Sequence, residues 1–541
     1  MRATDIPADN EQEGTRQGTR RLRGRPAHQP GRLASASGGT SNLQPSSTGA
    51  TGQINRRKFL LAGTAGAALL GGPLGAALLS GSSQRARASA ATPATSGQWT
   101  APFALTLVSI HATVLHTGNV LLFSWPNKTV GSDAVLWNPV SGSITNIALT
   151  YQRDIFCGGN TVLPDGRVFI AGGHIYQGAI LPTDGVNNTT VFDPAANSWT
   201  EGPVMDVARW YPTAVQLGDG TVRVFGGTLN SGAQATTVDS YDPSANTLTT
   251  LPASASKAVS TYPRIKLTTS GLLAWTNLAT TFFFNPATST WTKGPKLNSG
   301  GRSVNDTSVL LPGLTKIMEM GGATAGAASA TAEILDLSAS PLAWKSTASM
   351  SFPRLWHNTV LLADGTVLVV GGGASDKFTG PVLTPELYDP VAATWTQMAA
   401  QTAPRMYHST AVLLPDGRVL SAGQSSGSLQ KTGEVFSPPY LFAGARPTLT
   451  SAPAAVGYNQ QFTITTPDFA SIGRVALVKA GSVTHSNDFD QRYVDLTYTS
   501  DGSTGLTATS PLDSNHAPPG WYMLFILASG VPSVASWVRV G

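Results

Sequence analysis

The chain has 541 residues, of which only 12% are charged, and it contains 57 glycines and 36 prolines, a composition that favours turns and short strands over helices. Its formal net charge of +5 is concentrated in residues 1–88, which hold twelve basic and four acidic residues and leave 23 basic against 26 acidic residues in the remainder. The main part of the chain therefore gives no indication of a phosphate-binding surface, and we expect no nucleic-acid partner.

The N-terminal part is predicted to be a leader of two segments. Residues 1–55 are rich in Arg, Gly, Ser and Gln, which predicts a disordered extension. Residues 56–88 begin with Arg56 and Arg57 before a short apolar run, the pattern of a Tat-type export signal. The alternative is a transmembrane anchor, which the glycines and Pro73 in the run disfavour. We expect an exported protein, secreted or associated with the cell envelope, whose mature domain does not insert into the membrane. Whether the leader is cleaved stays open.

One unit recurs after residue 98. Its mark is a tetrad of apolar, aromatic, polar and Pro residues, expected at the end of the closing strand of each unit. Seven copies, with ILDL the most divergent, begin at positions 136, 191, 240, 283, 334, 387 and 435. An earlier strand often ends in a glycine pair, and a Trp usually follows the tetrad. This period predicts a seven-bladed kelch-type β-propeller over residues 99–442, with blade four the least regular because residues 265–290 lack the glycine pair.

The repeat stops after the seventh copy. From residue 446 to residue 541 the chain alternates strand-like runs such as RVALVK and WYMLFIL with turn clusters. We predict a single immunoglobulin-like β-sandwich over 446–541, so the fold class is all-β throughout.

Four short segments carry side chains suited to a metal centre. They are FCGGN with Cys157, ARWYPT with Tyr211, PRMYHST with Tyr407 and His408, and VTHSND with His485. Two imidazoles and two phenol oxygens form an N2O2 set that suits Cu(II) better than zinc, calcium or magnesium. Taken alone, a single histidine is better explained as an ordinary core residue, and either tyrosine could also be one.

Cys157 is the single cysteine of a chain that we expect to be exported. It is either a small buried apolar residue or a reactive thiol that forms a cross-link. One copper ion passes one electron, whereas oxidation of an alcohol takes two. A tyrosine made easier to oxidise by a thioether to a cysteine sulfur would hold the second.

From about residue 99 to its end the chain resembles the galactose oxidase and glyoxal oxidase family, the copper-radical oxidases. The resemblance is carried by the FC-G segment, AR-x-Y, PR-x-YHS, VTH followed by DQR, and PPGWYMLF. It implies one copper ion and a Cys157–Tyr211 thioether that forms a tyrosyl radical cofactor. Tyr211, His408 and His485 would be equatorial ligands, and Tyr407 the axial ligand and general base. His485 would reach the propeller axis on a loop of the sandwich.

The resemblance further implies an oxidase of primary alcohols or small aldehydes that uses O2 and releases H2O2. The alternative is a kelch propeller without catalysis that binds a cell-wall glycan or a protein partner. The sequence does not choose among glyoxal-type aldehydes, glycolaldehyde, sugars and polysaccharide ends as substrates. We expect a monomer.

Two positions depart from the family pattern. Galactose oxidase has a Trp stacked over its cross-linked Tyr after a glycine pair, but here TLNSG follows Gly227, so either Trp210 or Trp356 covers the ring or the ring is more exposed. Arg302 lies near the position of an arginine that contacts substrate in galactose oxidase, although the local spacing differs.

Overall fold

The computed structural model describes residues 92–126, 131–151, 153–175, 185–302, 305–324, 327–375 and 379–541. They lie within one compact unit, Ser89–Gly541. The leader segments predicted at 1–55 and 56–88, and with them the export signal, lie outside the described residues. Among the helices that are described, none is long and apolar enough to cross a membrane.

Most of the described chain is a seven-bladed propeller. The first three strands of each blade pair antiparallel in chain order, and a fourth strand completes the blade. The first two strands of blade 2 are buried along their whole length, whereas the fourth is largely exposed. A blade has two apolar faces, and neighbours packed in a ring cover both. The predicted all-β propeller is confirmed.

The strands of the blades follow one another in chain order. Blade 1 has β3 (His111–Val114), β4 (Val120–Phe123), β5 (Ala134–Trp137) and β6 (Ile144–Asn146); blade 2 has β7 (Gly159–Val162), β8 (Val168–Ala171), β9 (Thr189–Asp193) and β10 (Ser198–Glu201); blade 3 has β11 (Thr213–Gln216), β12 (Val222–Phe225), β13 (Asp239–Asp242) and β14 (Thr247–Thr250). Blade 4 has β15 (Ile265–Leu267), β16 (Leu273–Trp275), β17 (Thr280–Asn285) and β18 (Thr290–Lys296); blade 5 has β19 (Asp306–Leu310), β20 (Lys316–Gly321), β23 (Ala332–Asp336) and β24 (Trp344–Thr347), with the small hairpin β21 (Ala323–Thr324) and β22 (Ala327–Ala328). Blade 6 has β25 (Leu355–Leu361), β26 (Val367–Gly373), β27 (Glu386–Asp389) and β28 (Thr394–Gln397); blade 7 has β29 (Ser409–Leu413), β30 (Val419–Gly423) and β31 (Thr432–Ser437).

Blade 7 is completed by the N-terminal end of the described chain. After the one-turn helix α1 (Pro93–Ser96), strand β1 (Gln98–Trp99) pairs with the C-terminal end of β31, and β2 (Phe103–Ala104) pairs with its beginning. The ring is therefore closed by hydrogen bonds between the two ends of the propeller, which protects the edges of the last blade.

The repeated tetrad marks the third strand of each blade, and the prediction that it closes the unit was wrong. The tetrads beginning at 136 and 191 fall at the ends of β5 and β9, and a tight turn then leads into the fourth strand. The tryptophans that follow the tetrads lie on these fourth strands, for example Trp199 on β10.

Four blades bury the same ion pair between an arginine before the first strand and an acid on the third. The pairs are Arg209 with Asp239 (2.8 Å), Arg302 with Glu333 (2.9 Å), Arg354 with Glu386 (2.6 Å) and Arg405 with Glu434 (3.1 Å). Each guanidinium also donates at 2.9 to 3.0 Å to the carbonyl of a glycine in or directly after the second strand of its blade, namely Gly226, Gly321, Gly371 and Gly423. These glycines have φ between 65° and 80°, a left-handed conformation that explains the repeated Gly.

The remaining strands form a β-sandwich. One sheet has the order β32 (Ala455–Val456), β42 (Ser536–Val540), β40 (Gly520–Ala528), β34 (Ile472–Lys479) and β37 (Arg492–Leu496), with β41 (Val531–Pro532) beside β40. The other has β33 (Gln461–Thr465), β39 (Gly505–Thr509) and β38 (Tyr498–Ser500). Short 3-10 turns lie at Ala253–Ala255, Pro439–Phe442 and Phe469–Ser471.

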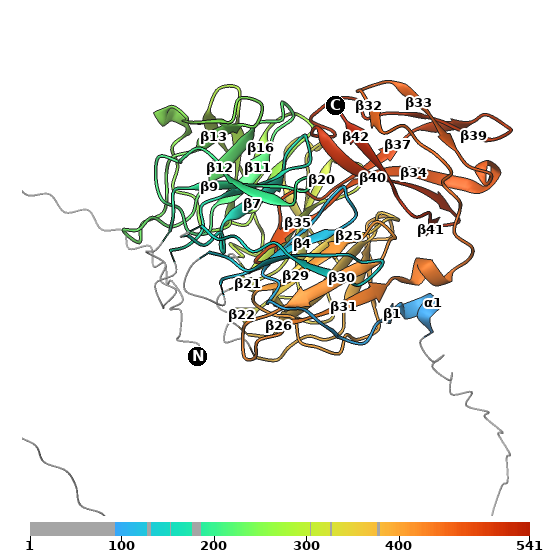
Figure 1. Ribbon diagram of the computed structural model, residues 1–541, viewed down its shortest axis with the longest axis horizontal. Helices are drawn as coiled ribbons and strands as arrows, with labels where there is room; N and C mark the ends of the chain where they lie inside the picture. Colours follow the sequence, from blue (N-terminus) through green and yellow to red (C-terminus); the bar gives the residue numbers. More distant parts are fainter. Residues whose placement is uncertain are drawn as a thin grey trace, which may run out of the picture. The chain divides into compact units, whose positions relative to one another are not determined.

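A hairpin of the sandwich enters the propeller. Strands β35 (Ser482–Thr484) and β36 (Asn487–Asp488) connect β34 to β37, and β35 pairs with β3 of blade 1, so that Thr484 is opposite His111. In Figure 1 the label of β35 lies beside that of β4 in blade 1, away from the orange and red strands of the sandwich. The sandwich therefore contributes directly to the propeller axis.

Candidate metal centre

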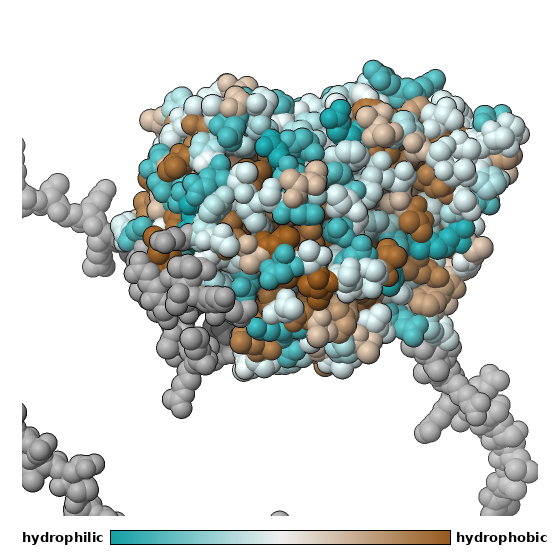
Figure 2. Space-filling model, viewed as in Figure 1, coloured by the Kyte–Doolittle hydropathy of each residue, from teal (hydrophilic) through white to brown (hydrophobic). Residues whose placement is uncertain are grey.

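The outer surface gives little guidance to the site. Hydrophobic and hydrophilic residues are interspersed on the face shown in Figure 2. The large apolar side chains that are exposed in the described ranges are scattered along the chain: Val140, Val204, Val391, Leu429, Phe442, Leu512 and Val534. Scattered apolar residues of this kind are normal for a protein surface, so the candidate site has to be found inside the ring.

The site residues of the propeller lie where the chain enters the first strand of a blade. Cys157 precedes β7, Tyr211 precedes β11, and Tyr407 and His408 precede β29. Cys157, Tyr211 and His408 have φ of 65°, 63° and 66°. A left-handed backbone costs a non-glycine residue roughly 1–2 kcal/mol. The ring of blades thus holds three side chains in a strained conformation at one place, which is typical of functional sites.

His485 completes the group from the sandwich hairpin. It lies between β35 and β36 with φ of 46°, and it is 3% exposed. The Thr484 hydroxyl donates to the Ile110 carbonyl at 2.9 Å, so it accepts a hydrogen bond from His485 Nδ1 at 2.7 Å. This leaves the lone pair on His485 Nε2, which accepts from the Tyr211 hydroxyl at 3.1 Å.

The four oxygen and nitrogen donors predicted from the sequence lie together. The hydroxyls of Tyr211 and Tyr407 are hydrogen-bonded to each other. The imidazole rings of His408 and His485 are 4.5 Å apart and nearly perpendicular, at 85°. All four residues are 8% exposed or less. The structure therefore assembles an N2O2 set from three separate segments of the chain.

His408 has the orphaned atom that a metal would satisfy. Its Nδ1 lies 2.6 Å from the Ser425 hydroxyl, whereas its Nε2 is buried with no hydrogen-bond partner among the described residues. A buried polar nitrogen without a partner is costly. Ligand atoms of Cys157, His408 and His485 also lie within 4.8 Å of one another. Residues and geometry thus fit a copper ion, for which imidazole and phenolate are suitable ligands.

Burial keeps these groups neutral in the metal-free chain. It raises the pKa of the phenols of Tyr211 and Tyr407 above the usual value, and it lowers the pKa of His408 and His485 well below theirs. Neutral imidazoles present a lone pair, as a metal requires. A bound cation would act against the burial effect at the phenols by favouring their ionised form.

Cys157 lies against Tyr211. Burial raises the pKa of its thiol, and the neighbouring side chains of Tyr211 and Trp210, which belong to the same buried cluster, partly oppose this effect. The Tyr211 backbone N–H donates to the Cys157 carbonyl at 3.1 Å. The thiol therefore has the phenol of Tyr211 as a direct neighbour, and it is completely buried.

Trp210 covers the ring of Tyr211. The two rings stack with centroids 3.7 Å apart and planes inclined by 16°. Trp356 instead meets the ring of Tyr407 at 66°, with centroids 4.7 Å apart. Of the possibilities that the sequence left open, the structure therefore shows that Trp210 stacks on Tyr211.

Arg302 is not part of the site. It is fully buried, pairs with Glu333 and donates to the carbonyls of Gly321 and Thr331. These are the contacts of the repeated blade arginines, so the suggested match to a substrate-contacting arginine is wrong.

Sequence analysis missed two buried residues of the centre. His111 accepts the Cys157 backbone N–H at 3.1 Å on Nε2, and its Nδ1 donates to Asn160 at 3.0 Å. Tyr262 stacks on Tyr211 with centroids 4.6 Å apart. His111 has no sequence signal, whereas Tyr262 does: a proline follows it, as Pro212 follows Tyr211.

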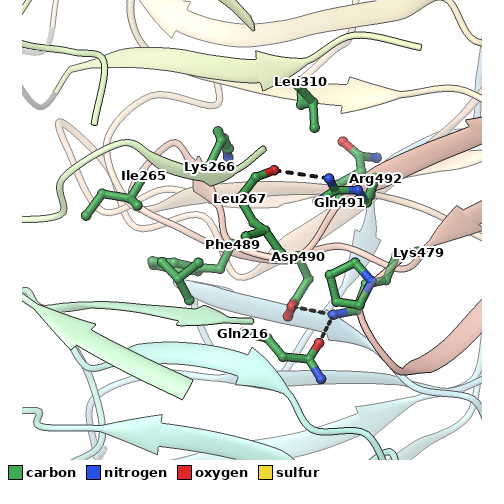
Figure 3. Close-up of a pocket in the computed structure, with 12 residues that line it drawn as sticks. Gln216, Ile265, Lys266, Leu267, Leu310, Lys479, Phe489, Asp490, Gln491 and Arg492 are labelled. Carbon is green, nitrogen blue, oxygen red and sulfur yellow. Dashed lines mark hydrogen bonds and ion pairs between the residues drawn. The ribbon is translucent and has the colours of Figure 1, made fainter. Parts of the chain in front are cut away.

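The hairpin that carries His485 is held by a polar cluster at the junction of propeller and sandwich. In Figure 3 the Lys479 ammonium donates hydrogen bonds to Asp490 and to Gln216 of blade 3. The Arg492 guanidinium donates to the Leu267 carbonyl of blade 4. Asp490 also accepts hydrogen bonds at 2.8 Å from Thr161 and Val162 of blade 2. The hairpin is thus tied to several blades at once, which fixes the position of His485.

Known proteins resemble this chain over most of its length. The family model for the glyoxal oxidase N-terminus matches residues 127–438, and the model for the galactose oxidase-like early set domain matches residues 446–540. A galactose oxidase from Gibberella zeae is 29% identical over 491 residues, covering 82% of this chain and 70% of the relative. An aldehyde oxidase GLOX from Vitis pseudoreticulata is 30% identical over 449 residues, covering 72% of this chain and 83% of the relative.

A solved structure extends the likeness to three dimensions. A fungal alcohol oxidase of the AA5 family, in complex with copper, is 27% identical with a TM-score of 0.72, covering 82% of this chain and all of that one. The resemblance predicted from the sequence motifs is confirmed. One family model matches the propeller and the other matches the sandwich that follows it. The protein therefore belongs to the glyoxal oxidase and galactose oxidase family, a family of oxidase enzymes.

Proposed function

We propose that the protein is an exported copper-radical oxidase that oxidises a primary alcohol or a small aldehyde with O2 and produces H2O2. The observation that carries this proposal is the burial of two phenols, two imidazoles and the single thiol of the chain against one another at the propeller axis. The names of the relatives, which are galactose, aldehyde and alcohol oxidases, support the same chemistry.

Tyr211, Tyr407, His408 and His485 would hold the copper ion through two phenol oxygens and two imidazole nitrogens. When bound, copper would polarise the substrate oxygen and accept one electron. The protein orients the two imidazoles by hydrogen bonds from Nδ1, to Thr484 in His485 and to Ser425 in His408. Such partners fix the ring orientation and the tautomer of a ligand histidine.

Tyr407 is the candidate general base. Its phenol oxygen would accept the hydroxyl proton of the substrate, a role that requires a base within hydrogen-bond reach. The ring is held between His408, stacked at 3.8 Å, and Trp356. The burial of Tyr407 excludes bulk water, so its proton is exchanged with the bound substrate rather than with solvent.

Cys157 and Tyr211 would form the covalent cofactor. In this step the S–H bond and one ring C–H bond break, and a C–S bond forms. Two protons and two electrons leave and reduce O2 to H2O2. The thioether makes the phenol easier to oxidise, and Tyr211 would then accept the hydrogen atom from the substrate carbon. Trp210 covers one face of this ring and limits the access of water to it.

The proposal is tested with full-length protein purified without copper. After addition of copper and oxygen, we expect an intact mass lower by two hydrogens, one tightly bound copper per chain, and H2O2 production with at least one substrate class. Cys157→Ser is expected to bind copper without the mass loss. A copper-loaded wild type that never loses the two hydrogens would contradict the proposal, and a chain that binds glycan but releases no peroxide would favour the binding alternative.

The substrate is best sought by measuring peroxide across classes. Glyoxal-type aldehydes, glycolaldehyde, sugars and polysaccharide ends form a sufficient panel, because substrate choice resides in the loops at the mouth of the site. We also propose export through the segment 56–88. Replacement of Arg56 and Arg57 by Lys should abolish export while the purified chain keeps its copper binding.

A further inference from the structure

Tyr262 is a buried tyrosine that the proposed reaction does not use. It is 2% exposed, and its place before β15 in blade 4 matches that of Tyr211 before β11 in blade 3. Both have a left-handed backbone, with φ of 41° and 63°, and both precede a proline. Because the two blades repeat this position, a third phenol lies near the propeller axis.

The ring of Tyr262 lies on Tyr211. Their centroids are 4.6 Å apart and their planes are inclined by 26°. Trp210 stacks on the same phenol at 3.7 Å and 16°. One face of a phenol has room for one parallel ring at such separations, so the two neighbours cover opposite faces. Tyr211 is therefore enclosed between an indole and a second phenol.

Tyr262 also connects the two residues of the candidate cofactor. Its hydroxyl donates to the carbonyl of Gly158, next to Cys157, at 3.1 Å. Its backbone N–H donates to the carbonyl of Tyr211 at 2.7 Å, and the backbone N–H of Tyr211 donates in turn to Cys157. Because Cys157 and Tyr211 both have strained backbones, contacts of this kind are needed to hold the thiol beside the ring.

We propose that Tyr262 is a third tyrosine of the cofactor site, with two separable functions. Its ring closes the face of Tyr211 that Trp210 leaves open, and its hydroxyl holds the peptide after Cys157 so that the sulfur meets the phenol. The inference rests on the proposed Cys157–Tyr211 cofactor. A radical covered on both faces is shielded from water and from reductants, so Tyr262 extends its lifetime.

The two functions are separated by two variants of the full-length chain. Tyr262→Phe keeps the ring and loses the hydroxyl, whereas Tyr262→Met fills the space without a ring. Tyr388→Phe is the control, because Tyr388 of blade 6 is also fully buried and its hydroxyl is hydrogen-bonded to Thr347 of blade 5. The rate of the two-hydrogen mass loss after copper addition, and the decay of the radical by its visible absorption, are measured without substrate.

We expect Tyr262→Phe to slow the mass loss several-fold while the radical lifetime stays as in the wild type. Tyr262→Met should slow the mass loss and shorten the lifetime several-fold, and Tyr388→Phe should change neither. Wild-type rate and lifetime in both Tyr262 variants would overturn the inference while the proposed function stands. If Tyr262→Met does not fold, an unchanged mass-loss rate in Tyr262→Phe is sufficient to overturn it. A wild type without the mass loss refutes the proposed function itself.

Discussion

Two sets of positions can be compared between blades: the arginine before the first strand, and the position two or three residues after it, near the propeller axis. The first set has the same residue in four blades, whereas the second has different residues. Blades 3, 5, 6 and 7 bury the same guanidinium against the same type of acid. Two or three residues farther along, the chain carries Tyr211, Trp356 and His408 in a common left-handed conformation but with different side chains. The repeated arginines fix the course of the backbone, and the positions that follow them hold the residues of the candidate site. Substitutions in the two sets should therefore change different measurements.

The largest effect is expected from an axial substitution. Tyr407→Phe keeps the ring against Trp356 and His408 but removes the oxygen that would accept the proton. We expect kcat/KM for peroxide production to fall by roughly 10²–10⁴-fold, the usual contribution of a general base, with little change in the free energy of unfolding. The measurement is peroxide release on the best substrate of the panel, beside urea unfolding. Unchanged turnover would remove Tyr407 from the catalytic group.

A substitution of a repeated blade arginine should instead lower the free energy of unfolding and leave the mass loss on copper loading intact. Arg405→Met leaves Glu434 buried without its partner, which typically costs about 3–5 kcal/mol of unfolding free energy. The double variant Arg405→Met/Glu434→Leu should recover much of this loss, since no unpaired charge is left. The folded fraction of both should still lose two hydrogens on copper loading. A loss below about 1 kcal/mol in Arg405→Met would mean that the pair does not hold the blade.

Titration should detect the buried histidine beside the candidate site. Burial lowers the pKa of His111 to about 3, so below about pH 6.5 the unfolded chain binds a proton that the folded chain does not. Stability of the metal-free protein should therefore be full above this pH and decrease as the pH falls, by up to about 1.4 kcal/mol per pH unit for each such histidine.

The contribution of His111 is isolated with His111→Gln, whose amide can still accept from Cys157 and donate to Asn160. Unfolding is measured between pH 7.5 and pH 5.5. We expect a shallower slope in the variant by about 0.7 kcal/mol per pH unit, averaged over this range. Equal slopes would show that His111 does not titrate in this way.

The smallest effect is expected at the surface. Arg167 pairs with Asp165 at 2.6 Å, with side chains 31% and 49% exposed. Arg167→Gln should cost less than about 1 kcal/mol, because water screens the pair. A cost equal to that of Arg405→Met would mean that burial is not what distinguishes the blade arginines.

The propeller, and the five candidate residues that the structure brings together, were accessible from the sequence because each has a local mark. The tetrads and glycine pairs recur at a fixed period, and Cys157, Tyr211, Tyr407, His408 and His485 stand in distinctive segments. The tetrad was placed on the wrong strand because its turn resembles the end of a unit, and the closure of blade 7 by β1 depends on a pairing between distant parts of the chain.

The other residues of the site depend on packing that no short motif records. Trp210 was one of two candidates, and only the fold shows which indole lies over Tyr211. His111 acts through a hydrogen bond across two blades. Arg302 was misplaced because its segment resembles a substrate site, while its partner Glu333 lies 31 residues away on β23. Contacts between blades are thus the feature of the site that could not be predicted from the sequence.

The late position of the β35–β36 hairpin in the chain has a consequence for biosynthesis. Domains form progressively as the polypeptide leaves the ribosome, and His485 emerges only after all seven blades have been translated. A truncated product would have the thiol, both phenols and one imidazole but not the second. The complete donor set therefore exists only after the hairpin has been translated, which would confine maturation of the proposed centre to molecules that extend beyond His485.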